Sequence, residues 1–282
     1  MKDGVTAAYA GQWLALGTRH GKQRQLQPAF AARLGARLTV PRRLDTDQFG
    51  TFSGERPRTL SAPAAAAAKA RLAMQATGLP FGVASEASYG PLPDVGWPGH
   101  EELLIFIDAT RGIQVLEGLR VLDMPAPGQR VRSAEEVRLE RWLWPAQRLI
   151  VRPATSTVSP VVKGVANRAT LRAAVARAAR ADPAGLAVVE PDLRAHANPS
   201  RRRVLRLLAA RLAERLRVAC PACACPGFGR TDVERGLPCQ DCGSATDQVR
   251  AELHSCPRCE HLLRVPRAVP HGDPRWCPQC NP

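Results

Sequence analysis

The residues with the clearest chemistry are eight cysteines near the C-terminus, arranged as four Cys-x-x-Cys pairs. Fifteen residues separate the first pair from the second, and seventeen separate the third from the fourth. This is the spacing of two consecutive zinc ribbons, in which two pairs close a tetrahedron of thiolates around one Zn²⁺. We therefore expect two structural Zn²⁺ ions, each held by two consecutive pairs. The pairs are Cys220/Cys223, Cys239/Cys242, Cys256/Cys259 and Cys277/Cys280.

A disulfide framework in a secreted domain is the alternative explanation of this spacing. It is disfavoured because no cysteine precedes Cys220 and because the start, Met1-Lys2-Asp3, lacks the pattern of a signal peptide. We therefore expect a reducing, cytoplasmic location. The ninth cysteine, Cys225, is expected to be a spare, with an exchange against Cys223 as the alternative. Zinc with four thiolate ligands has no open position for water, so any catalysis is expected upstream.

The chain carries a formal net charge of +15, which favours a polyanionic partner such as a nucleotide or nucleic acid. Of its 40 Lys and Arg residues, only four are lysine. Three of these, Lys22, Lys69 and Lys163, sit in compact local patterns. An ammonium is not interchangeable with a guanidinium where a phosphate or carboxylate must be met at one point. Chance survival of a few lysines in an arginine-rich composition is the open alternative.

A polar loop between an apolar segment and a helical pattern is a candidate phosphate site. Trp13–Leu16 is expected to be a buried strand and Gln25–Leu34 a helix with one apolar face. A helix that begins after such a loop offers free amide donors to an anion. The loop matches neither common phosphate-binding fingerprint. Its candidate substrate-binding residues are Thr18, Arg19, His20 and Lys22.

Acidic residues in two later segments could hold Mg²⁺ near that loop. Asp45 and Asp47 precede Glu55 in a glycine-punctuated loop, and Glu86 lies in an expected strand. Carboxylates would hold the ion and orient water, while a nearby cation such as Lys69 would meet the phosphate charge. The alternative for the two aspartates is a solvated loop with side-chain-to-backbone turns. The catalytic candidates are Asp47, Glu55 and Glu86.

Acidic, basic and imidazole side chains alternate after another expected strand, Leu186–Glu190. In an extended chain, Glu190, Asp192, Arg194 and His196 would share one face at the strand edge where α/β folds place function. Arg194 and His196 are therefore further substrate-binding candidates. Salt bridges among these residues that anchor the following helix are the alternative.

The other elements follow from apolar periodicity and turn residues. Asn198 and Pro199 are expected to start a long arginine-rich helix, as N-cap and first helical residue. The apolar stripe of that helix is Leu205, Leu208, Leu212 and Leu216. Further expected helices are Pro63–Thr77, Ser133–Leu143 and Thr170–Ala181. Further expected strands are Gly82–Pro91, with a turn, the hairpin Leu103–Asp108 and Ile113–Leu119, and Leu149–Arg152.

These elements predict an α/β protein: a mixed-sheet N-terminal body followed by a long basic helix and tandem zinc ribbons. The expected divisions are the body 1–197, with a sub-boundary near 125–147, the connecting helix 198–218 and the ribbons 219–282. No apolar run approaches the roughly 18 residues that a membrane span needs. No membrane partner is therefore expected, and the oligomeric state stays open.

Five motifs together resemble a family of bacterial proteins known only as a domain of unknown function. They extend over nearly the whole chain, and the family name implies no activity. The motifs are Thr18-x-His20-Gly21-Lys22, Asp45-Thr46-Asp47-x-x-Gly50-Thr51-Phe52-Ser53-Gly54-Glu55, Ala84-Ser85-Glu86-x-Ser88-x-Gly90-Pro91, Val189-Glu190-x-Asp192-x-Arg194-Ala195-His196-x-Asn198-Pro199 and Pro226–Gly229.

Over about residues 12–125, the order of elements is also similar to that of nucleoside-triphosphate pyrophosphatases of the inosine/xanthosine triphosphatase type. In those enzymes a loop with Thr and Lys holds the triphosphate, while acidic residues hold Mg²⁺ and orient water. The resemblance implies that Thr18, Lys22 and Lys69 contact phosphate. It also implies that Glu55 and Glu86 hold the metal or act as the base. The asparagine typical of that loop is absent here.

The sequence thus favours a Mg²⁺-dependent hydrolase of a nucleotide or another phosphorylated substrate, with the ribbons as a basic docking surface. The alternative is a non-catalytic protein that binds nucleic acid or docks other proteins. Such a nucleic-acid binder would present a continuous positive face from Arg201 to Arg217 and on through the ribbons.

Overall fold

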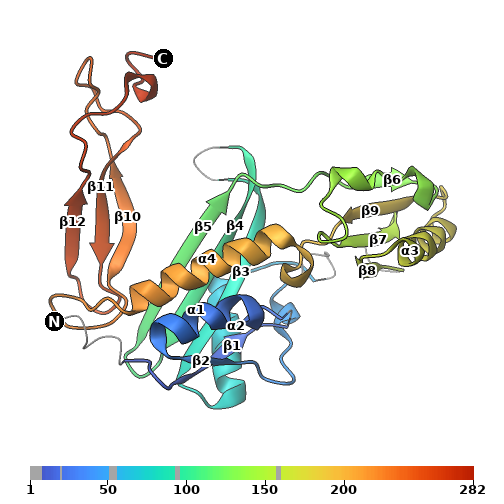
Figure 1. Cartoon of the computed structure of the whole chain (residues 1–282), viewed down its shortest axis with the longest axis horizontal. Coiled ribbons are helices and arrows are strands. Elements are labelled where there is room, and N and C mark those ends of the chain that lie inside the picture. The colour runs from blue at the N-terminus through green and yellow to red at the C-terminus, as the bar shows by residue number, and fades with distance from the viewer. Residues whose placement is uncertain (1–7, 20, 51–55, 93–95, 157–159) are drawn as a thin grey trace.

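The computed structural model describes residues 8–19, 21–50, 56–92, 96–156 and 160–282. Figure 1 shows three parts: a central body, a small lobe (residues 129–191) and a long arm (residues 219–282) that ends at the C-terminus. Within the described residues, no helix combines the length and the apolar character needed to cross a lipid bilayer.

The central body is built on a five-stranded mixed sheet with the order β2-β1-β3-β4-β5. Strand β1 pairs in parallel with both β2 and β3. Strands β3, β4 and β5 then form an antiparallel meander. The expected hairpin is therefore confirmed as β4 and β5. The strands are β1 Trp13–Gly17, β2 Arg37–Thr39, β3 Phe81–Pro91, β4 Pro98–Asp108 and β5 Ile113–Val121.

Helices cover both faces of this sheet, so the body has three layers (Figure 1). Helices α1 (Gln23–Leu34) and α4 (Pro199–Leu216) pack on one face, and α2 (Ala62–Thr77) packs on the other. The side chains of β4 alternate accordingly, as a strand with two buried faces requires. Leu104 and Phe106 join the core under α1 and α4, while Ile105 and Ile107 join the core under α2.

Alanine-rich α2 lies very close to the sheet. A Cβ added at Gly17 would lie 2.2 Å from the carbonyl oxygen of Lys69, so only glycine fits there. Ser61 is the N-cap of this helix, and its side chain accepts a hydrogen bond from the Ala64 amide. Gly78 is the C-cap and has the left-handed conformation. This close approach fixes Lys69 beside the end of β1.

The small lobe contains a four-stranded antiparallel sheet with the order β6-β9-β7-β8, covered by α3 (Arg168–Ala181). The chain passes from the central sheet to this second sheet over residues 122–128. The strands are β6 Gln129–Val131, β7 Leu149–Pro153, β8 Val162–Val165 and β9 Ala187–Pro191.

The expected helix Ser133–Leu143 is wrong. Only two short 3₁₀ turns form there, Ala134–Glu136 and Leu139–Arg141. The Gln129 side chain accepts from the Arg138 amide at 2.9 Å and donates to the Arg138 carbonyl at 3.1 Å. These contacts engage backbone groups that a continuous helix would need for its own hydrogen bonds.

Helix α4 begins as expected, because the Asn198 side chain accepts from the Arg201 amide and Pro199 is the first helical residue. The expected leucine stripe is confirmed, since Leu205, Leu208, Leu212 and Leu216 are all fully buried. The helix packs along the central body and is not a free connector (Figure 1).

The arm is a three-stranded antiparallel sheet, in the order β10 (Gly229–Arg235), β11 (Val249–Ser255) and β12 (Leu262–Pro266). Its base rests on the central body, where Ile113 of β5 packs against Phe228 and Cys225. Its other end carries the C-terminus away from the body (Figure 1).

Adjacent leucines on α4 give a matched test of this packing. Leu208 is 0% exposed and Leu207 is 50% exposed. We expect Leu208→Ala to lower the free energy of unfolding by about 2–5 kcal/mol, because it leaves a cavity in the core. Leu207→Ala is expected to change it by less than about 0.5 kcal/mol. Urea unfolding followed by circular dichroism measures both, and equal effects would contradict the packing of α4.

Candidate functional site

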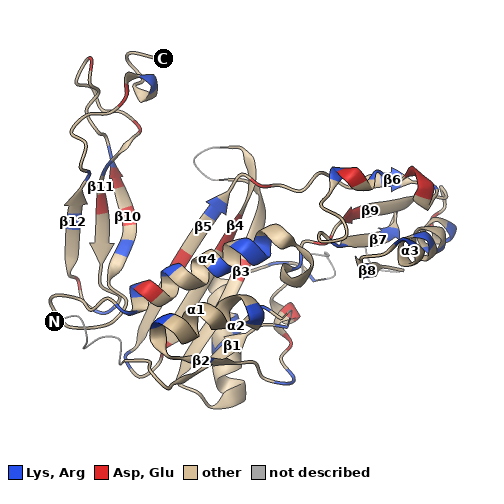
Figure 2. Ribbon diagram, in the orientation of Figure 1, with Lys and Arg blue, Asp and Glu red and all other residues tan. Residues whose placement is uncertain are grey.

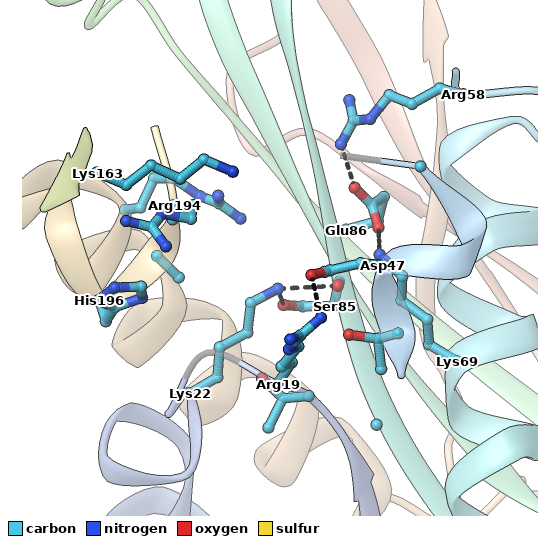
Figure 3. A pocket seen from close by; sticks show the side chains of 16 residues that line it. Arg19, Lys22, Asp47, Arg58, Lys69, Ser85, Glu86, Lys163, Arg194 and His196 are labelled. Atoms are coloured by element: carbon cyan, nitrogen blue, oxygen red, sulfur yellow. Dashed lines mark hydrogen bonds and ion pairs between the residues drawn. The ribbon is translucent and has the colours of Figure 1, made fainter. Parts of the chain in front are cut away.

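A cavity of about 450 Å³ opens where the end of β1, the start of α1 and the middle of β3 face the small lobe. Figure 3 shows Arg19, Lys22, Lys69 and Glu86 on one side of it, with Lys163, Arg194 and His196 on the other. Most of its lining residues carry polar or charged side chains. The lining residues are Gly17, Thr18, Arg19, Lys22, Thr46, Asp47, Gly50, Arg58, Lys69, Ser85, Glu86, Lys163, Arg194, Ala195, His196 and Arg201.

Lys22 is the N-cap residue of α1, and its side chain runs into the floor of the cavity. Its Nζ donates to the Ser85 carbonyl oxygen at 3.0 Å and to the Ser85 Oγ at 2.7 Å. Burial lowers the pKa of Lys22 to about 8, because the ammonium loses its hydration. Lys22 is therefore a cation whose charge depends on pH near neutrality.

A buried ion pair lies directly beneath Lys22. The Arg201 guanidinium donates from Nε and Nη2 to the two oxygens of Glu102, at 2.8 and 3.0 Å. Arg201 is 2% exposed and Glu102 is 0% exposed. Ser85 Oγ donates to the same carboxylate at 3.1 Å. The network therefore joins α4 to β4 and β3 and holds Ser85 where Lys22 meets it.

Glu86 is held between two cations, because its carboxylate accepts from Lys69 Nζ and from Arg58 Nη2 (Figure 3). Burial alone would raise the pKa of Glu86, but the charges of Lys69, Lys22 and Arg58 lower it below its ordinary value. Glu86 is therefore ionised at neutral pH. A ligand with negative charge would compete with it for Lys69 and Arg58.

Asp47 lies on the rim, in the 3₁₀ turn Thr46–Phe49, and accepts from Arg19 Nη1 at 2.8 Å. Asp45 caps this turn by accepting from the Asp47 amide at 3.1 Å, and it does not line the cavity. Asp45 is half exposed and lies 3.5 Å from Arg19 and 3.6 Å from Arg56. The solvated-turn alternative therefore describes Asp45, whereas Asp47 faces the cavity.

The opposite wall comes from the small lobe and the segment that follows it. Lys163 lies in β8, and Arg194 and His196 follow β9. Arg194 is paired with Asp192, Nη2 to Oδ2 at 2.6 Å. Burial lowers the pKa of His196, helped by the charge of Arg194, so the imidazole is neutral near pH 7.

The expected single face for Glu190, Asp192, Arg194 and His196 is wrong. Glu190 pairs with Arg152 at 3.1 Å and lines a different cavity. Asp192 is fully buried behind Arg194. The alternation fails because the strand ends at Pro191, before Asp192, and the chain bends at Arg194 into the 3₁₀ segment Ala195–Ala197.

The structure thus brings together eight of the proposed site residues, Thr18, Arg19, Lys22, Asp47, Lys69, Glu86, Arg194 and His196. Glu55 and His20 lie outside the described residues. Sequence reasoning missed Arg58, Ser85, Arg201 and the placement of Lys163 as site residues. The rarity of lysine could have identified Lys163 as a site residue, whereas no local sequence pattern identifies Arg58.

The charges around the cavity are unequal. Among the described residues, seven Lys or Arg side chains line it, against the two carboxylates of Asp47 and Glu86. Glu102 and Asp192, just behind the lining, raise the number of carboxylates to four. An excess of about three positive charges remains, which makes the cavity suited to an anion with several charges.

The eight cysteines form two four-thiolate clusters, but their combination differs from the expected one. The base centre contains the first and third pairs, Cys220, Cys223, Cys256 and Cys259. The tip centre contains the second and fourth pairs, Cys239, Cys242, Cys277 and Cys280. The expected consecutive ribbons are therefore wrong, and the two centres are interleaved.

The three strands of the arm explain the interleaving. One strand lies between each pair and the next, and neighbouring strands are antiparallel. Successive pairs therefore alternate between the two ends of the sheet. The pairing of Gly229 with Ser255 brings the first and third pairs to the base, and the second and fourth pairs meet at the far end.

The sulfur separations within each centre suit a tetrahedral metal site. Neighbouring sulfurs lie 3.6 to 3.9 Å apart. Four thiolates at about 2.3 Å from a zinc ion would be about 3.8 Å apart, whereas disulfide sulfurs are about 2.05 Å apart. Each centre is therefore compatible with a structural zinc ion.

Cys225 belongs to neither centre, as expected. Its thiol is buried against Phe228, and burial raises its pKa to about 11. Cys225 is therefore a neutral thiol that packs at the base of the arm.

A family model for a domain of unknown function, DUF6671, matches residues 69–282. The chain belongs to this family. The predicted membership of a family known only as a domain of unknown function is thereby confirmed. The five motifs stay predictions, and those around Thr18 and Asp45 lie before the matched region. The search of curated proteins and the search of solved structures each gave no significant match. The similarity to nucleoside-triphosphate pyrophosphatases therefore stays a prediction.

Two quadruple variants test the interleaving. Serine at positions 239, 242, 277 and 280 is expected to leave the base centre complete, with one metal ion per chain. Serine at positions 220, 223, 239 and 242 removes half of each centre, so no complete centre is expected. Consecutive pairing gives the opposite pair of results. Elemental analysis of the purified variants decides between the two.

The pKa of Lys22 predicts the pH dependence of anion binding. Above about pH 8 the ammonium loses its proton, so the affinity for sulfate is expected to fall by up to about tenfold per pH unit. Sulfate is a suitable probe because its own charge is constant from about pH 6.5 to about pH 10. Titration calorimetry over this range measures the effect.

Lys22→Met is the matched variant for this prediction. It is expected to bind sulfate weakly at every pH, with no fall above pH 8. A wild-type profile that stays flat between pH 7 and pH 10 would show that Lys22 does not meet the anion.

Proposed function

We propose that this protein is a Mg²⁺-dependent hydrolase of a nucleotide or another phosphorylated substrate, which binds in the cavity between the central body and the small lobe. One observation carries the proposal. The whole chain contains four lysines among 40 basic residues, and three of them line this one cavity. An ammonium meets a phosphate as a compact point charge, which arginine does not reproduce.

The three lysines come from separate elements, as convergent binding requires. Lys22 stands at the start of α1, Lys69 on α2 and Lys163 on β8. If lysine had been retained by chance, three lysines so far apart in sequence would not be expected to line the same cavity. The lining guanidinium groups add planar donors for phosphate oxygens.

The carboxylates suit a magnesium ion that arrives with its substrate. Asp47 and Glu86 line the cavity, and within the described residues no cluster of three or more carboxylate or histidine ligands is found. Mg²⁺ is commonly bound through one or two carboxylates together with substrate phosphates. Asp47 would hold it in that way, together with phosphate oxygens of the substrate, and Glu86 would act on the attacking water. When bound, the ion neutralises charge that develops on the phosphate oxygens.

The ion pairs of Glu86 suggest how substrate binding would prepare the site. Phosphate oxygens would take over Lys69 and Arg58, which now neutralise Glu86. Loss of these two cations would raise the pKa of Glu86 and make the carboxylate a better proton acceptor. Glu86 would then orient a water molecule and accept its proton while the water oxygen attacks phosphorus and the leaving oxygen departs with its electron pair.

We also propose that each four-thiolate centre holds one structural Zn²⁺. Four thiolates saturate zinc, so the ions would stabilise the arm and leave the chemistry to the cavity. Eight ligating thiols need a reducing environment, which is why we keep the proposal of a cytoplasmic location.

Release of phosphate and pyrophosphate from nucleoside triphosphates with Mg²⁺ tests the proposed activity. Glu86→Gln is expected to lower the turnover by about 10²–10⁴-fold while substrate binding persists, because it removes the proton acceptor. Glu190→Gln is the matched control, since Glu190 pairs with Arg152 and lies outside this cavity. A Glu86→Gln protein as active as the wild type would exclude this role, and the metal content shows that the arm is intact.

Protein docking by the arm is a second candidate function, favoured by the outer strand. Every residue of β12 is exposed, including Leu262, Leu263 and Val265, and Trp276 near the tip is also exposed. A continuous basic face for nucleic acid is less well supported. Arg201 is buried against Glu102, and Arg215 binds Glu117 at 2.9 Å, so these two charges of α4 point inward.

A further inference from the structure

We infer that the cavity recognises a chain of phosphates and does not read a nucleobase, so that inorganic tripolyphosphate is a sufficient ligand. This inference rests on the proposed function and names the substrate class of the same site.

The charge of the cavity favours more than one phosphate. About three positive charges remain after the carboxylates in and behind the lining are counted. One phosphate group carries about −1.5 to −2 at neutral pH. A single phosphate would therefore leave part of this net positive charge uncompensated, whereas a chain of two or three phosphates supplies the missing negative charge.

The position of the cations favours an extended anion over a compact one. Lys22 and Lys69 stand on the central body, and Lys163 and Arg194 stand across the cavity from them (Figure 3). A phosphate chain carries charged oxygens along its length and can meet both walls at once. Each wall then contributes to the binding of a different phosphate.

The chemistry of the lining offers little to a base. Among the described lining residues, none has an aliphatic side chain larger than alanine, and the imidazole of His196 is the one aromatic ring. Stacking on an aromatic side chain typically improves affinity by roughly fivefold to more than a hundredfold per base. Among the described lining residues, His196 is therefore the aromatic ring on which a base could stack.

The test compares inorganic tripolyphosphate with ATP, GTP, CTP and UTP, each titrated into the full-length protein with Mg²⁺. The five affinities are expected to agree within about threefold. Lys163→Met is expected to weaken all five by about tenfold to a hundredfold, because it removes one charged contact to the chain. Arg177→Gln is the charge-matched control on the exposed face of α3 and is expected to change none of them.

Two outcomes would overturn the inference in different ways. A preference of more than about tenfold for one nucleotide over tripolyphosphate, lost in His196→Ala, would show that a base is read while the proposed function stands. Binding of none of the five compounds by the folded, metal-loaded protein would overturn the proposed function itself. Equal binding of all five, weakened in Lys163→Met alone, supports the inference.

Discussion

The buried pair between Arg201 and Glu102 is the interaction on which the site depends. Two charged groups without access to water are tolerated only when their geometry satisfies both, and here two parallel hydrogen bonds do so. The pair fixes the start of α4 against β4. It also orients Ser85, and through Ser85 the ammonium of Lys22. Loss of either partner would leave a buried charge, which typically costs 3–5 kcal/mol.

The cavity is formed by the central body and the small lobe together. The central body supplies the cations at the end of β1 and on α2, while β8 and the segment after β9 supply the others. The exact fit of α2 against Gly17 sets one wall, and the 3₁₀ turn after β9 sets the other. Segments far apart in sequence therefore contribute charges to one volume, which is why the site does not follow a short local motif.

Local patterns were a good guide to the elements of this chain. Apolar periodicity predicted α1, α2, α3 and α4 within a few residues, and Asn198 with Pro199 marked the start of α4. The pattern failed at Ser133–Leu143, where the Gln129 side chain engages the backbone of Arg138. Polar residue types in the loops at Thr18 and Asp47 and in the strand at Glu86 pointed to residues that line the cavity.

Local sequence patterns do not show which distant segments of the chain contact each other. The Cys-x-x-Cys spacing identified all eight thiolates, but the partners were assigned by proximity in sequence, and strand direction decides otherwise. The nucleic-acid alternative places Arg201 on a positive surface, because no residue near it in sequence indicates its partner Glu102, which is 99 positions away. Long-range pairings of this kind come from the packing of the whole fold.

The interleaved thiolates also constrain how the arm is completed during synthesis. The outermost sulfurs are separated by 39 positions in the base centre and by 41 in the tip centre, so a metal ion bound there would close a long loop of chain. The two loops overlap, because Cys239 and Cys242 lie within the loop of the base centre and their partners, Cys277 and Cys280, follow it. A growing chain that has passed Cys259 but has not yet reached Cys277 could thus complete the base centre, while Cys239 and Cys242 wait at the tip for their two partner sulfurs.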